Sequence, residues 1–355
     1  MTWIDHNAPL VTTADRAAVD RVLQSGWIAP GPERQRLEED LVEHFGAGRA
    51  VATTSGTLAL FLALVGLDAP AGALIAVPTY SCVALLDAVR LAGCRPLVVD
   101  VEPDGLTMSP SSLQDASDRI GKPYAAFVVH TYGATAALPD LAEICPNLVE
   151  DCCHSFGSRG PHGEHGTFGR VAVSSLYATK VFTGATGGLC WSADPEISER
   201  IISYTQASFR SSRWPRMTLT LSDLHAALAR SQLSRLAQVR ERRAWITDQY
   251  LAACPDALAP AGLPDPGRLV YRFVLRCADE KERERLLGFF HKHEVDASRL
   301  TQRHELLHRE LGFGPDHFPA AEAIVARTLS LPLYPAMSDA DVRRVCDLLA
   351  QLPAD

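Results

Sequence analysis

The residues of this chain best suited to chemistry lie in one stretch, residues 174–191, around a single lysine. The chain has four lysines and thirty arginines, and of the lysines only Lys180 lies among small and apolar residues. Burial there would lower the pKa of the amine and leave it nucleophilic, as formation of a Schiff base requires. The alternative is a lysine that extends from a strand edge toward solvent. The other parts of the sequence must decide between the two.

A second group could bind an anion. Ser55, Gly56 and Thr57 directly precede an apolar helix. The backbone N–H groups and hydroxyls of such a turn lie at the positive end of the helix dipole, which favours a phosphate. An ordinary helix N-cap has the same composition. Ser175, five residues before Lys180, could face the same phosphate.

The third group follows the apolar residues Asn147–Val149. Asp151 ends a predicted buried strand, where a carboxylate needs a cation or a hydrogen-bond donor as partner. A protonated pyridine nitrogen would be one such partner. His154 could donate to a phenolate or carbonyl oxygen, or it could be a buried imidazole with purely structural hydrogen bonds.

A fourth group is rich in arginine. Arg210, Arg213 and Arg216 lie in one irregular loop, which could hold an anionic part of a substrate or be an ordinary solvated loop. His304 and His308 are four residues apart, as metal ligands on one helical face would be. No third ligand with suitable spacing follows, so we expect no metal site.

The elements that must position these groups alternate in the manner of an α/β fold. Short apolar strands and helices alternate from about residue 50 to residue 153, which predicts a mostly parallel sheet covered by helices on both faces. The carboxyl ends of such strands share one edge, where ligands collect. Residues 222–254 predict one long amphipathic helix. The Pro- and Gly-rich residues after it predict a boundary between a large domain (1–253) and a small C-terminal α+β domain (254–355).

Composition excludes several classes of protein. With a net charge of −8 and a pI near 5.8, the chain has no basic surface for nucleic acid. The sequence has neither an apolar run long enough to span a membrane nor a signal peptide, so we expect a cytoplasmic protein. Nine cysteines without CxxC spacing predict reduced thiols.

Together, a phosphate-binding turn, a partner for a pyridine nitrogen and a nucleophilic lysine are the parts needed to hold pyridoxal phosphate. The chain resembles the DegT/DnrJ/EryC1/StrS family of sugar aminotransferases, fold type I enzymes that use this cofactor. The resemblance runs nearly end to end and rests on the order and spacing of the motifs LQSGWIAPGPERQRLEEDL, VATTSGTLALFLAL, VVDVEPDGLTM, VEDCCHSFGS, SLYATKVFTGATGGL, DLHAALARSQLSRL and TLSLPLYPAMSDADV.

The resemblance implies roles for individual residues. Lys180 would bind the cofactor as a Schiff base and move a proton between cofactor and substrate. Asp151 would keep the pyridine nitrogen protonated, and His154 would lie near the phenolic oxygen. The phosphate cup would consist of Ser55, Gly56, Thr57 and Ser175.

The resemblance also implies the reaction and the assembly. Glutamate or glutamine would donate the amine, and a keto sugar linked to a nucleoside diphosphate would accept it, at a site completed across a homodimer interface. The substrate would meet the arginine-rich loop and further residues, Trp27, Tyr177 and His304.

Three departures from the family pattern keep other functions open. The family's Gly-Glu-Gly-Gly is Ala185-Thr186-Gly187-Gly188 here, which removes an acidic side chain. The family's interface asparagine has no clear counterpart. The aromatic residue over the cofactor ring is Tyr80 or, by strict spacing from Pro78, is replaced by Cys82. The alternatives are therefore a non-sugar ketone as acceptor, a dehydratase, or a homologue that binds a sugar nucleotide without turnover; the lysine at position 180 favours transamination.

Overall fold

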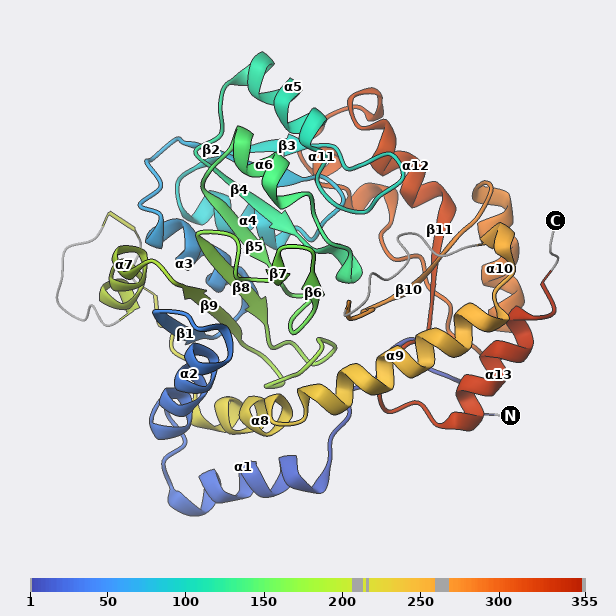
Figure 1. The fold of residues 1–355 in the computed structure, drawn as a ribbon, viewed down its shortest axis with the longest axis horizontal. Helices are drawn as coiled ribbons and strands as arrows, with labels where there is room; N and C mark the ends of the chain where they lie inside the picture. The colour runs from blue at the N-terminus through green and yellow to red at the C-terminus, as the bar shows by residue number, and fades with distance from the viewer. Residues whose placement is uncertain (1, 206–212, 215–216, 259–267, 353–355) are drawn as a thin grey trace.

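The structure is a computed structural model that describes residues 2–205, 213–214, 217–258 and 268–352. Its centre is a seven-stranded sheet in the order β1-β9-β8-β5-β4-β2-β3 (Figure 1). The strands are β1 (Arg49–Thr53), β2 (Leu74–Pro78), β3 (Arg95–Val99), β4 (Ala125–Val129), β5 (Leu148–Asp151), β8 (Val171–Ser175) and β9 (Gly188–Ser192). Only β9 runs antiparallel to its neighbours, so the expected mostly parallel sheet is confirmed.

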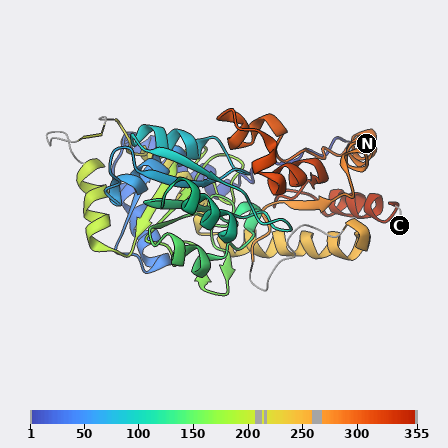
Figure 2. The same cartoon turned by 90° about the horizontal axis from the view of Figure 1, so that it is seen from above.

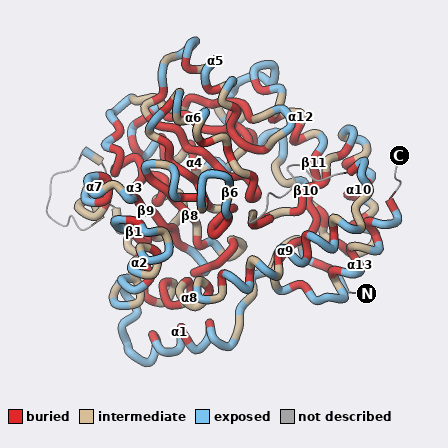
Figure 3. Tube along the Cα trace, in the orientation of Figure 1, coloured by how far each residue is buried: buried red, intermediate tan, exposed pale blue. Residues whose placement is uncertain are grey.

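Both faces of the sheet are buried, which explains why its strands are continuously apolar (Figure 3). Val51, Val149 and Val173 pack on one face with α3 (Gly56–Gly66), α4 (Ala84–Leu91) and α7 (Pro195–Thr205). On the other face, the helices are α2 (Pro32–Phe45), α5 (Pro110–Ile120), α6 (Leu138–Ile144) and α8 (Asp223–Leu233). A further helix, α1 (Thr13–Ser25), packs on α8.

The prediction of a single long helix over residues 222–254 is wrong. The chain forms α8 and then α9 (Leu236–Ala253), with a bend at Ser234 and Arg235. At the bend, the guanidinium of Arg235 binds the buried carboxylate of Asp15 at 2.7 Å. The bend lets α8 pack on α1 and α2 while α9 packs on α13 (Asp339–Leu349).

The C-terminal part of the chain has a core of its own beside the large sheet. It contains the antiparallel pair β10 (Phe273–Arg276) and β11 (Thr328–Leu331) and the helices α10 (Glu280–Lys292), α11 (Leu307–Glu310), α12 (Pro319–Arg327) and α13. The core includes Ile246 and Tyr250 of α9 and also Ile4, which bridges to Val295. Both chain termini lie at this end of the molecule (Figures 1 and 2). The division into domains at residue 253 stays a prediction.

Short elements complete the chain. They are the two-residue strands β6 (Arg159–Gly160) and β7 (Gly163–Glu164) and the 3-10 turns η1 (Thr131–Gly133), η2 (Asp256–Leu258), η3 (Arg303–Glu305) and η4 (Pro315–His317). Among the helices of the described ranges, none combines the length and the hydropathy that a membrane span requires.

The start of α3 lies so close to the β8–β9 hairpin that Gly188 cannot carry a side chain without a backbone shift, and Gly56 has little room for one. A Cβ on Gly188 would lie 2.2 Å from the carbonyl oxygen of Ser55, and a Cβ on Gly56 would lie 3.1 Å from the Cβ of Ser175. Both distances are tighter than ordinary van der Waals contact. The first turn of α3 is thereby held against the ends of β8 and β9.

We predict that Gly188→Ala lowers the free energy of unfolding by about 1–3 kcal/mol, because its Cβ must push the backbone of Ser55 away. Gly288→Ala is the matched control: it lies inside α10 with open space around its Cβ position, and should stabilise the protein by about 0.5–1 kcal/mol. Chemical denaturation of both variants measures the two effects. Equal stability of the Gly188 variant and the wild type would contradict the close packing.

Candidate active site

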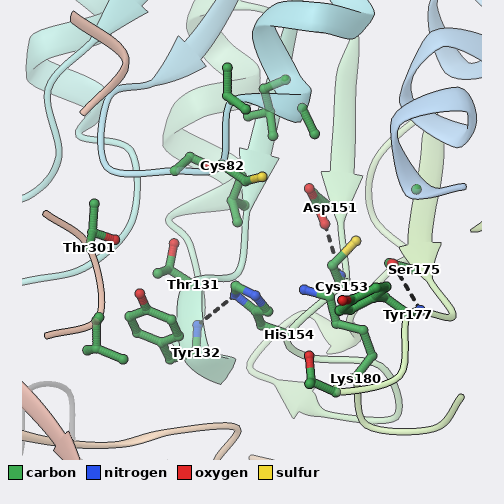
Figure 4. Close-up of a pocket in the computed structure, with 18 of the residues that line it drawn as sticks. Cys82, Thr131, Tyr132, Asp151, Cys153, His154, Ser175, Tyr177, Lys180 and Thr301 are labelled. Atoms are coloured by element: carbon green, nitrogen blue, oxygen red, sulfur yellow. Dashed lines mark hydrogen bonds between the residues drawn. The ribbon is translucent and has the colours of Figure 1, made fainter. Parts of the chain in front are cut away.

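A cavity of about 830 Å³ lies at the carboxyl edge of the sheet. Its walls come from the ends of β4, β5 and β8, the start of α3, and the segments around residues 271 and 301 of the C-terminal part. The side chains of Asp151, His154, Ser175 and Lys180 surround one shared space (Figure 4). Residues from three groups that the sequence singled out separately are therefore neighbours.

One end of the cavity suits a phosphate. The side chain of Ser55 caps α3 by accepting from the N–H of Leu58 at 3.2 Å, and Gly56 and Thr57 begin the helix. Ser175 closes this end, where its hydroxyl accepts from the N–H of Tyr177 at 3.3 Å. The exposed backbone N–H groups of a first helical turn, together with hydroxyls, form an anion site.

Asp151 lies deeper in the cavity, at the last position of β5. Its side chain is 4% exposed, and one carboxylate oxygen accepts from the N–H of Cys153 at 2.9 Å (Figure 4). A carboxylate so far from water favours a cationic partner inside the cavity.

His154 is fixed in orientation and in tautomer. Its ring stacks on Tyr271 at 4.5 Å and on Tyr132 at 5.3 Å, and the N–H of Tyr132 donates to Nδ1 at 3.5 Å. Burial, with Lys180 and then Arg272, lowers the pKa of His154 well below its usual value. The ring is therefore neutral and carries its proton on Nε2, so it can donate one hydrogen bond.

The sequence predicts a lowered pKa for Lys180, and this is wrong. Burial does act to lower the pKa of the amine, but the anionic forms of Tyr271, Cys153 and Asp151 attract the ammonium and raise it above its usual value. The amine lies 5.6 Å from the centre of the Tyr271 ring. The apolar neighbours of Lys180 in sequence gave no sign of these partners, which come from β5 and from the C-terminal part of the chain.

The turn after Lys180 departs from regular geometry where it departs from the family pattern. Ala185 has φ = 68°, a left-handed conformation that costs a residue with a Cβ about 1 kcal/mol. Thr186 donates through its hydroxyl to the carbonyl oxygen of Thr54 at 3.3 Å and lines the cavity. Thr186 thus ties the hairpin to the segment before α3.

The remaining predicted site residues fall into three groups. Tyr80, Tyr177 and His304 line the cavity. Trp27 is 60% exposed and does not line it, and Arg213 instead pairs with Asp68 at 2.6 Å. Arg210 and Arg216 lie outside the described residues.

The cavity wall that would cover a cofactor ring contains a cysteine. Tyr80 is 1% exposed, with its hydroxyl 3.4 Å from that of Tyr132, whereas Cys82 is exposed and lines the cavity. Both Tyr80 and Cys82 therefore line the cavity, and the choice between them as the residue over the ring stays a prediction.

Sequence reasoning missed His6, Tyr132, Tyr271 and Arg272, which all line the cavity. None of them lies in a motif, and only folding brings them to the lysine. The one signal in the sequence was the largely apolar run at residues 269–277, in which Tyr271 and Arg272 place a phenol and a guanidinium side by side.

Glu150, next to Asp151, has a structural role. Its carboxylate is fully buried and accepts from His130 Nε2 and from the N–H groups of Gly166, Phe168 and Gly169, at 2.7–2.9 Å. Cys152 completes a cluster with the geometry of a metal site, but these hydrogen bonds already use both oxygens of Glu150. The cluster fastens the loop at 166–169 to β5 and so fixes the strand end that carries Asp151.

The cavity fits pyridoxal phosphate. Because Gly56 has no Cβ, space remains open beside Ser175. The N-terminal turn of α3 begins at this space and can donate N–H groups to the phosphate. Asp151 suits a protonated ring nitrogen, His154 Nε2 suits the ring oxygen, and the Lys180 amine suits the aldehyde carbon.

Comparisons with known proteins agree with this geometry. The model of the DegT/DnrJ/EryC1/StrS aminotransferase family matches residues 9–350. The chain belongs to this family. The predicted family, the α/β fold of fold type I aminotransferases, the enzyme class and the pyridoxal phosphate cofactor are thereby confirmed.

Three relatives illustrate the match. A dTDP-4-dehydro-2,3,6-trideoxy-D-glucose 4-aminotransferase of Saccharopolyspora spinosa is 30% identical, over 97% of this chain and 95% of its own. The aminotransferase TlmJ of Streptoalloteichus hindustanus superposes with a TM-score of 0.87 at 28% identity, over 98% of both chains. The putative sugar aminotransferase Spr1654 of Streptococcus pneumoniae, in its PLP form, superposes with a TM-score of 0.89 at 22% identity, over 98% of both chains.

We predict that Glu150→Gln lowers the free energy of unfolding by about 3 kcal/mol near neutral pH, since an amide cannot accept all four hydrogen bonds. Burial would raise the pKa of Glu150, but His130 and the N–H groups of Gly169 and Gly166 lower it from 4.5 to about 2. The stabilisation is thus present above pH 4.5 and is lost as the pH falls toward 2.

The difference in the free energy of unfolding between wild type and Glu150→Gln should therefore become smaller as the pH falls from 4.5 to about 2. Denaturant unfolding at several pH values measures this difference. Glu284→Gln is the control: the pKa of Glu284 is also lowered to about 2, through Arg299, but its side chain is 40% exposed. We expect Glu284→Gln to lower the free energy of unfolding by less than about 1 kcal/mol. A pH-independent difference for Glu150→Gln would refute the assignment.

Proposed function

We propose that this enzyme transfers the amino group of glutamate or glutamine to a keto sugar linked to a nucleoside diphosphate. One observation carries the proposal: Asp151, His154, Ser175 and Lys180 meet the start of α3 around a single cavity. The acceptor class is supported by the Saccharopolyspora spinosa relative, whose name describes amination of a dTDP-linked keto sugar.

Each cavity residue has a definite task in this proposal. Bound pyridoxal phosphate supplies the electron-withdrawing ring that makes the carbon bearing the amine acidic. Lys180 would hold the cofactor. Its released amine would move a proton between the Cα of the substrate and C4′ of the cofactor. Asp151 keeps the ring nitrogen protonated, since its buried carboxylate needs a cation. His154 donates through Nε2 to the ring oxygen.

Among the described residues, those that form the phosphate end include neither a lysine nor an arginine. The N–H groups that begin α3, with the hydroxyls of Ser55, Thr57 and Ser175, supply the hydrogen bonds. The close packing of Gly56 and Gly188 holds these donors in fixed positions, so they are in place before the phosphate binds.

We propose that the active unit is a homodimer in the cytoplasm. Trp27 and the neighbouring Ile28, which is 51% exposed, form an apolar surface that a second subunit would cover. Trp27 and Arg213 do not line the cavity of their own subunit, so the substrate roles predicted for them require such a second subunit. All nine cysteines are free, which suits a reducing compartment.

A non-sugar cyclic ketone is the second candidate acceptor. The observation that favours it is Thr186, whose hydroxyl binds the Thr54 carbonyl where the family pattern has an acidic side chain. Assaying nucleotide-linked keto sugars beside cyclitol and amino-acid ketones, with glutamate as donor, separates the two candidates.

We predict that Lys180→Ala abolishes amino transfer and the visible absorbance of a lysine-bound cofactor, because no other lysine lines the cavity among the described residues. The variant should still fold, since Lys180 belongs to none of the buried apolar clusters that form the core of the protein. Lys292→Ala, at an exposed position near the end of α10, is the matched control and should retain both properties. Absorbance spectra and thermal unfolding measure the effects; a cofactor band in the Lys180 variant would refute the assignment.

A further inference from the structure

Arg272 is the one arginine among the described residues that line the cavity. We infer that it binds a carboxylate of the amino donor, with His6 holding its guanidinium in place. This inference rests on the proposed function, because it names the residue that recognises the donor in the first half of the reaction.

The position of Arg272 suits a donor that reacts at Lys180. Its Cζ atom lies 5.0 Å from the centre of the Tyr271 ring, and Lys180 Nζ lies 5.6 Å from the same point. An α-amino acid carries its amine and its carboxylate on one carbon. Arg272 and Lys180 line the same cavity, so a donor whose amine replaces that of Lys180 can direct a carboxylate toward Arg272.

The charge of Arg272 is not neutralised by the protein. No carboxylate of the described residues lies within 4.0 Å of its guanidinium, although Asp151, Glu305 and Glu310 also line the cavity. By contrast, Arg213, Arg230 and Arg235 each pair with an acid. A partly buried cation that no protein carboxylate pairs favours an anionic ligand.

His6 orients Arg272 without cancelling its charge. Arg272 Nη1 donates to His6 Nδ1 at 2.9 Å, and His6 Nε2 lies 3.0 Å from the hydroxyl of Ser330. Burial and then the charge of Arg272 lower the pKa of His6 to about 3, so the imidazole is neutral at physiological pH. Of the guanidinium nitrogens of Arg272, only Nη1 makes hydrogen bonds to the described residues. Nε and Nη2, one edge of the guanidinium, stay available for the two oxygens of a carboxylate.

The cofactor phosphate and the sugar nucleotide explain Arg272 less well. The phosphate end is built from Ser55, Gly56, Thr57 and Ser175, while Arg272 faces Tyr271 and His6. A diphosphate is larger than a carboxylate and more highly charged. The guanidinium of Arg272, held by His6, offers one pair of donors, Nε and Nη2, which matches the two oxygens of one planar carboxylate.

The test uses the cofactor-loaded enzyme and Arg272→Met. Binding of glutarate, which carries carboxylates but no amine, is measured by calorimetry, and the half-reaction with L-glutamate is followed by absorbance. Both affinities should fall by about 10- to 100-fold, the usual effect of losing a charge-assisted pair. The cofactor spectrum and the affinity for the sugar nucleotide should not change.

Three comparisons make the result specific. Arg276→Met removes an arginine at the other end of β10, one that is 40% exposed and bound to Asp104, and should leave both affinities unchanged. Arg272→Gln keeps a donor for His6 and replaces the methionine variant if that variant unfolds. L-Glutamine lacks the γ-carboxylate: a loss for both amino acids assigns Arg272 to the α-carboxylate, and a loss for glutamate alone assigns it to the γ-carboxylate.

Unchanged binding of glutarate and L-glutamate in a folded Arg272 variant would overturn the inference, as would a loss confined to the sugar nucleotide. These outcomes differ from failure of the proposed function. In that case the wild-type enzyme itself would show no spectral change with L-glutamate, while the glutarate measurement would still report on Arg272.

Discussion

The site depends on the burial of three cations around one tyrosine. Lys180, Arg243 and Arg272 lie 5.6, 5.5 and 5.0 Å from the centre of the Tyr271 ring. Burial raises the pKa of this phenol, but Lys180 and Arg272 outweigh burial and lower it below its usual value. The face of the Tyr271 ring offsets part of the repulsion between the cations. Arg243 is held further by the carbonyl oxygens of Tyr271 and Leu333, at 3.1 Å each.

This arrangement joins three distant parts of the chain at the residue before the lysine. The carbonyl oxygen of Thr179 accepts from Asn7 Nδ2 at 3.1 Å and from the Tyr271 hydroxyl at 3.0 Å. The N-terminal segment, the β8–β9 hairpin and the C-terminal part therefore all meet beside Lys180. A change in how the C-terminal part packs would act directly on the position of the amine.

The sequence was sufficient for residues whose places follow from the sheet. Asp151 and Ser175 end strands, and parallel strand ends share one edge, so their approach to Lys180 follows from topology. Tyr271 and Arg272 could not be placed, because they reach the site only through packing between distant segments. For the same reason the predicted direction of the Lys180 pKa shift was wrong: the neighbouring residues in sequence indicated burial, but they did not indicate the partners, such as Tyr271, that raise the pKa.

The two ends of the cavity are built by different means, and this bears on specificity. At the phosphate end, an added side chain on Gly188 would collide with the backbone of Ser55, and one on Gly56 would press on the side chain of Ser175, so substitution there is costly. The opposite end consists of side chains from separate segments, such as His6, Arg272 and His304, that can be exchanged without disturbing the sheet. Cofactor binding and substrate choice are thereby separable, so Arg272 can set the donor independently of the contacts that hold the phosphate.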